Sequence, residues 1–285
     1  MLALIIGCSN PAGPVDPPVD PEPDNPPIKE TSAFNKVYSG GESSKVLKED
    51  GVLWAFGNNG LGQLGYGPAS DKSVPVRVMA DVKDVAMGAE HTLILKNDGT
   101  LWGCGNNLKG QLGNGVSVND DPFGPPPRPN PVPEKIMSSV AQVAAGGAHT
   151  SILKNDGTLW ICGSNWKSQL GDGTTTSSST PTKILDGVKD MAAGIHHTLA
   201  LKTDGILWGW GDNEFGQLGD GTTTASTTPK QISENVMNVK AGGFHTLIQK
   251  TDGTLWAFGK NNYGQLGDGS ILMSAEPLQI PPSLF

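Results

Sequence analysis

The sequence predicts an all-β protein built as a β-propeller, and three observations lead to this fold class. A phrase of a dozen residues, such as "KTDGILWGWGDN" from Lys202, recurs five times, and each copy is followed by "GQLG" or once by "SQLG". The apolar runs around these phrases are short and bounded by glycine, proline or Ser/Thr clusters, as is typical of strands. The chain also contains 39 Gly and 22 Pro, which leaves few stretches for helices.

The five copies follow a fixed period, which indicates a propeller or a solenoid. The steps between their Asp-Gly pairs are 48, 58, 48 and 48 residues, and the longer step comes from the proline-rich insertion "DPFGPPPRPNPVP" at 121–133. The units therefore occupy residues 34–80, 81–138, 139–186, 187–234 and 235–280, followed by a tail at 281–285.

Each unit contains four predicted strands, which in the fourth unit are "VKDMAAG", "HTLALK", "ILWGWG" and "PKQI". The second and third are joined by "TDG", where Asp204 can bond the backbone and Gly205 can adopt positive φ, so they form a β-hairpin. Both faces of the central strands are apolar or small, as in a sheet covered on both sides. One tryptophan recurs per unit, and we expect a buried ring with a bonded indole N–H. These are Trp54, Trp102, Trp160, Trp208 and Trp256.

The stretch "MAAGIHHTLAL", followed by "DGILWGWGDNEFGQLGDGTT", resembles the repeat of the regulator of chromosome condensation family, and the resemblance covers about residues 34–280. It implies a propeller, usually of seven blades, whereas five units are visible. Closure stays open at this point. The units could form an open arc or a strained ring, the sequence could be a fragment, or "NKVYSG" near the N-terminus could complete the last blade.

The N-terminal segment predicts a lipoprotein. "MLALIIGC" resembles a bacterial lipobox, so residues 1–8 are expected to be a signal that ends at the lipidation site, Cys8. Residues 9–33 are rich in proline and acids and form an extended tether. The alternative is a frayed apolar N-terminus, because no basic residue precedes the short apolar run. The expected location is the bacterial cell envelope, at the outer membrane or cell surface.

Several residues recur at single repeat positions, and we interpret them as structural. The histidines are expected to bond a neighbouring strand, because a blade width separates them and a metal ion needs ligands around one point. The acids after "QLG" are expected to be turn residues, since the calcium-loop pattern is absent. Cys104 and Cys162 are expected to be buried thiols, with a disulfide as the alternative. His196 lies outside the pattern and is expected at the surface. The recurring histidines are His91, His149, His197 and His245.

The sequence lacks G-x-S-x-G, H-E-x-x-H and P-loop motifs, so we expect no catalysis, metal or cofactor. A net charge of −8 with two arginines argues against a nucleic-acid partner.

Candidate partner-binding residues are those that vary while the repeated frame stays constant. They lie directly before "GQLG" and in the proline insertion, although any one of them could simply face solvent. The candidates are Leu61, Leu108, Trp166, Phe215, Tyr263, Phe123 and Arg128.

Two functions compete. The first is a non-catalytic protein-binding or scaffold propeller displayed outside the cytoplasm on a lipid anchor, with a protein partner of unknown identity. The second is guanine-nucleotide exchange on a small GTPase, which the family resemblance implies from its founding eukaryotic member. The acidic balance and the lipobox-like start favour the first.

Overall fold

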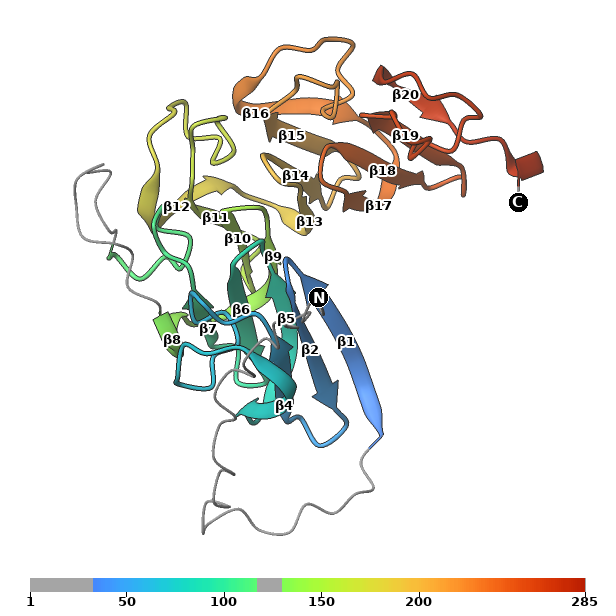
Figure 1. The fold of residues 1–285 in the computed structure, drawn as a ribbon. Coiled ribbons are helices and arrows are strands. Elements are labelled where there is room, and N and C mark those ends of the chain that lie inside the picture. The colour runs from blue at the N-terminus through green and yellow to red at the C-terminus, as the bar shows by residue number, and fades with distance from the viewer. Residues whose placement is uncertain (1–32, 117–129, 285) are drawn as a thin grey trace, which may run out of the picture. The chain divides into compact units, whose positions relative to one another are not determined.

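The computed structural model describes residues 33–116 and 130–284, coloured from blue to red along the chain in Figure 1. The described residues form five four-stranded antiparallel sheets, each made of consecutive strands, and one short 3-10 helix at Pro282–Leu284. No helix in this part of the chain is long and apolar enough to cross a membrane. The predicted fold class, all-β with five four-stranded repeats, is confirmed.

The sheets are the five blades. Blade 1 contains β1 (Phe34–Gly40), β2 (Ser43–Lys48), β3 (Leu53–Gly57) and β4 (Lys72–Met79). Blade 2 contains β5 (Val82–Met87), β6 (His91–Lys96), β7 (Leu101–Gly105) and β8 (Asn130–Met137). Blade 3 contains β9 (Val140–Ala145), β10 (His149–Lys154), β11 (Leu159–Gly163) and β12 (Ser178–Leu185). Blade 4 contains β13 (Val188–Ala193), β14 (His197–Lys202), β15 (Leu207–Gly211) and β16 (Ser226–Ser233). Blade 5 contains β17 (Val236–Ala241), β18 (His245–Lys250), β19 (Leu255–Gly259) and β20 (Ser274–Gln279).

The repeated phrase forms the turn between the second and third strands of each blade. In blade 4, β14 and β15 pair from His197–Gly211 to Leu201–Leu207. Gly205 has a φ of 80°, and the Asp204 carboxylate accepts the N–H of Ile206 at 3.0 Å. The predicted hairpin is therefore confirmed at this turn.

The N-terminal strand β1 is part of blade 1 and not of blade 5. β1 pairs with β2, and Val37 lies opposite Val46. Only Gly41 and Glu42 connect the two strands, and a two-residue connection holds its strands together as a hairpin. The alternative that "NKVYSG" completes the last blade is therefore wrong.

The repeated tryptophans are only partly buried, unlike the prediction. Trp102, Trp160 and Trp256 donate their indole N–H to a threonine in the preceding turn at 2.8–2.9 Å. Blades 1 and 4 carry Val52 and Ile206 at that turn position, so the buried indole nitrogens of Trp54 and Trp208 find no partner among the described residues.

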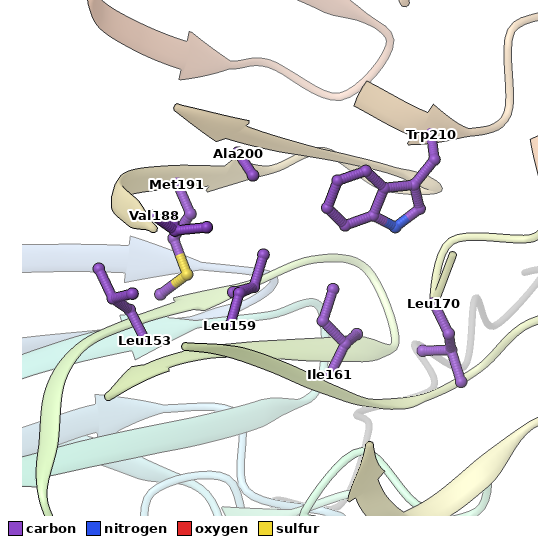
Figure 2. Packing of buried hydrophobic residues seen from close by; sticks show 8 residues of the cluster. All are labelled: Leu153, Leu159, Ile161, Leu170, Val188, Met191, Ala200 and Trp210. Carbon is purple, nitrogen blue, oxygen red and sulfur yellow. The ribbon is translucent and has the colours of Figure 1, made fainter. Parts of the chain in front are cut away.

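The core lies in the seams between neighbouring blades. Figure 2 shows the seam between blades 3 and 4, where the fully buried ring of Trp210 packs in the cluster that includes Leu159 and Ile161. The indole N–H of Trp210 donates to the main-chain oxygen of Gln169 at 3.0 Å. Cys104 and Cys162 occupy the same repeat position as Trp210, and both are free, buried thiols. Burial raises the pKa of each thiol to about 12.

The repeated histidines cross the same seams. Nε2 of His91, His149 and His197 lies 3.0–3.3 Å from a threonine hydroxyl in the next blade, respectively that of Thr150, Thr198 and Thr246. Each hydroxyl gives its single proton to a main-chain oxygen of the preceding blade at 2.6–2.8 Å, so the ring Nε2 must donate. Burial lowers the pKa of His91 and His197 to about 4 and that of His149 to about 3. These rings are therefore neutral at pH 7.

We predict that acid destabilises the protein through these histidines. Their folded pKa values lie below the unfolded value of about 6.5, so their contribution is intact above that pH and is lost as the pH falls toward 4. Near pH 5.5, unfolding should take up close to three protons at these sites. The free energy of unfolding should therefore fall by about 4 kcal/mol for each pH unit of acidification. His149→Gln should remove about one of them, as measured by urea unfolding between pH 5 and 6.5. An unchanged pH slope in His149→Gln would contradict this assignment.

The two end blades each have an uncovered face. Leu247 and Leu255 of blade 5 are 37% and 38% exposed, whereas their counterparts in blade 4, Leu199 and Leu207, are fully buried. At the other end, Val37 on β1 is 74% exposed. In this structure, neither end face covers the other.

We predict unequal costs for two equivalent truncations. Leu207→Ala should cost about 2–5 kcal/mol, because it opens a cavity in a covered seam. Leu255→Ala should cost less than about 1 kcal/mol, since its side chain already contacts solvent. Chemical denaturation of both variants measures the difference. Equal losses would mean that another surface covers the outer face of blade 5.

Candidate partner-binding surface

The loops between the third and fourth strands are held by repeated side chains. In blade 3, the Asn165 side-chain oxygen accepts the N–H of Leu170 at 3.0 Å. The Gln169 side-chain oxygen accepts the N–H of Lys167 at 2.9 Å. Asp172 accepts the N–H of Thr174 at 2.9 Å, so this acid acts as a turn residue. The Asn and Gln bonds recur in all five blades. The backbone is therefore constant, and the residues between the fixed points are free to vary.

These loops and the hairpin turns between first and second strands form one surface, which we call the loop face. The two sets are joined by main-chain bonds, as from Asp212 N–H to His196 oxygen and from Lys260 N–H to Phe244 oxygen, both at 2.9 Å. Of the predicted residues, Tyr263 is 90% and Trp166 59% exposed. Leu61, Leu108 and Phe215 are half-buried. Phe123 and Arg128 lie outside the described residues.

Two of the predicted residues, Trp166 and Phe215, belong to one aromatic cluster that spans blades 3 to 5. Trp166 packs edge-on against His196, with ring centroids 4.9 Å apart. His196 in turn contacts Phe244 at 6.3 Å, and Phe244 contacts Phe215 at 5.5 Å. We call Trp166, His196, Phe215 and Phe244 the aromatic cluster.

Two lysines flank the aromatic cluster. The Lys260 ammonium lies 4.9 Å from the Phe215 ring centroid and 5.2 Å from that of Phe244. The Lys167 ammonium lies 5.2 Å from the Trp166 ring and forms ion pairs with Asp212 at 3.4 Å and Glu214 at 3.6 Å. Burial lowers the pKa of His196, so its ring is neutral at pH 7. Lys260 therefore supplies a positive charge at the Phe215 and Phe244 end of the cluster, whereas at the Trp166 end two carboxylates face one ammonium.

Sequence reasoning missed His196, Phe244 and Lys260. The expectation that His196 lies at the surface is wrong in part, because the residue is half-buried and its ring packs edge-on against two aromatic neighbours. A signal was available in the residue that precedes the repeated histidine. It reads Glu42, Glu90, Ala148, His196 and Phe244 from blade 1 to blade 5.

A cavity of about 430 Å³ lies in the loop face and is lined by the hairpin turns between the first and second strands of all five blades. Its wall is mostly glycine and alanine, with Ile195 and Met87 as the larger side chains. A side chain at Gly146 would place its Cβ 2.1 Å from the His149 ring, so the close-packed histidine requires glycine there. Within the described ranges, no group of three or more His, Cys, Asp or Glu side chains could hold a metal ion.

The fold and the constant loop frame define a repeat propeller. The RCC1-like domain model matches residues 14–284, and the chain belongs to this family.

Solved structures share the fold. Human WBSCR16 is 26% identical with a TM-score of 0.77, over 88% of this chain and 67% of that one. Saccharomyces cerevisiae Prp20p is 21% identical with a TM-score of 0.73, over 87% and 63%. The ectodomain of the Arabidopsis thaliana receptor kinase ACR4 is 14% identical with a TM-score of 0.50, over 90% and 69%. The chain therefore spans about two thirds of the length of these proteins.

Proposed function

We propose that this chain is a non-catalytic protein-binding module whose partner docks on the loop face, and that it is displayed outside the cytoplasm on a lipid anchor. The observation that carries the binding proposal is the aromatic cluster. Its members come from three blades, yet they form one continuous set of ring contacts on a surface whose frame is otherwise constant.

The cluster has the physical properties of a binding anchor. Aromatic residues dominate the binding energy of protein interfaces, because each gives a large rigid contact for little conformational entropy. Phe215 is held by its own N–H, which donates to Gln217 at 2.9 Å. The loop backbone that carries Phe215 is thus fixed before a partner arrives, which lowers the entropic cost of binding.

The family supports protein binding in general terms. Prp20p has been studied for its binding to Gsp1p and to histones, and it has been solved bound to Kap60. Guanine-nucleotide exchange is the second candidate, and it rests on the family alone. A nucleotide-release assay on a small GTPase tests it, and release at the spontaneous rate would exclude it for that GTPase.

We predict that Trp166→Ala and Tyr263→Ala reduce partner capture from the native envelope at least about tenfold while leaving the melting temperature nearly unchanged, because both side chains are largely exposed. Phe34→Ala is the matched control, since Phe34 is an exposed aromatic on β1 in blade 1 (72%). Quantitative pull-down and thermal melting measure the two effects. Early melting with normal capture would show that these loops are structural.

The proposed anchor rests on Cys8, which lies outside the described residues. When the protein is expressed in bacteria, we predict that it incorporates labelled fatty acid and partitions into detergent, and that Cys8→Ser abolishes both, since the thiol is the acylation site. Unchanged partitioning of the Cys8→Ser protein would remove the lipoprotein proposal and leave the binding proposal standing.

A further inference from the structure

We infer that the aromatic cluster and Lys260 bind an acidic, apolar segment of a protein partner, with one carboxylate on the Lys260 ammonium and an adjacent apolar side chain on the rings. This inference rests on the proposed function and specifies the chemistry of its partner.

Lys260 is the charged centre of the site. Its ammonium lies about equally close to Phe215 of blade 4 and Phe244 of blade 5, at 4.9 and 5.2 Å from the ring centroids. It forms no ion pair with a described residue, whereas Lys167, at the other end of the cluster, is paired with two carboxylates. Lys260 is half-buried as a residue, and its ammonium, which has no carboxylate partner among the described residues, can attract an incoming anion.

A cationic ligand is disfavoured at this site. Aromatic rings can hold a quaternary ammonium group. Here, however, the Phe215 and Phe244 rings already face the Lys260 ammonium, which would repel a second cation bound to the same rings. His196 is neutral at pH 7 and supplies no compensating charge, because burial lowers its pKa.

A polyanion such as nucleic acid is also disfavoured. The chain has a net charge of −8, and Glu214 and Asp212 lie at the Trp166 end of the cluster. One ammonium without a carboxylate partner suits one carboxylate, whereas a phosphate backbone needs several cations in a row.

Exposed apolar side chains in and next to the aromatic cluster can receive the apolar side chain of the ligand. Trp166, a member of the cluster, is 59% exposed, and Ile195, next to His196 in the chain, is 37% exposed and lines the cavity. A leucine or phenylalanine beside the bound carboxylate can pack against these side chains. The expected motif therefore pairs Asp or Glu with a large apolar residue.

The test uses the full chain and a fluorescein-labelled octapeptide in which Asp alternates with Leu and Phe, with binding followed by fluorescence anisotropy. We expect saturable binding that weakens as salt is added. Lys260→Met should weaken it about tenfold, whereas Lys260→Arg should stay within about threefold, because the charge is kept. Lys189→Met is the matched control: it removes one exposed lysine on β13 and should leave binding unchanged. Thermal melting of each variant checks that it is folded.

Four results would overturn the inference. They are no binding of the acidic peptide at millimolar concentration, equal binding by Lys260→Met, tighter binding of the peptide with Lys in place of Asp, and tighter binding of a single-stranded oligonucleotide.

The pull-down separates this inference from the proposed function. If partner capture needs Trp166 and Phe215 but not Lys260, the loop face still binds protein and only the acidic chemistry is wrong.

Discussion

The seam between consecutive blades is the contact on which the rest of the structure depends. A four-stranded sheet with two apolar faces cannot be stable alone, so each blade must be covered by its neighbours. Each seam is closed by apolar side chains, and the seams that follow blades 2, 3 and 4 also by a short polar relay through a histidine and a threonine. In the seam of blades 3 and 4, the His149 ring donates to the Thr198 hydroxyl, which donates to the main-chain oxygen of Gln169. Because Gln169 also holds the loop of blade 3 through Lys167, the relay couples the core to the loop face.

This coupling explains why the loop face can vary. The side chains of Asn165, Gln169 and their counterparts accept hydrogen bonds from the loop backbone in every blade. The residues between them are therefore not needed to hold the loop. Variation then accumulates unevenly along the chain. The position before the repeated histidine changes from Glu42 and Glu90 in blades 1 and 2 to His196 and Phe244 in blades 4 and 5. The aromatic surface is consequently confined to blades 3 to 5, although all five blades share one frame.

The fold could be predicted because the same repeat occurs five times in the sequence, whereas the candidate site could be predicted only in part. Repetition exposed the hairpins, the strand order and the constant loops. It could not show that Trp208 would be half-buried while Trp210 fills a seam, since both side chains lie on the same face of one short strand and alternation does not distinguish them. The burial of Lys45 was even less predictable from the sequence. This lysine is fully buried where blades 2 and 4 carry leucine, and burial lowers its pKa to about 8. The contacts of His196 with Trp166 and Phe244 depend on three blades meeting, which no single repeat encodes.

The same constraint makes the two ends of the array unequal. On the outer face of blade 5, Gln249 stands where the first four blades carry leucine, and it accepts the amide N–H of Asn238 at 2.8 Å. Leu247 and Leu255, however, are exposed on the same face. The outer face of blade 1 exposes Phe34 and Val37 to a greater extent. Phe244 and Lys260 thus belong to a blade covered on one side only, and such a blade opens more readily than an inner one. A ligand held between blades 4 and 5 would bind only the closed arrangement, and so the free energy of binding would also stabilise the last seam.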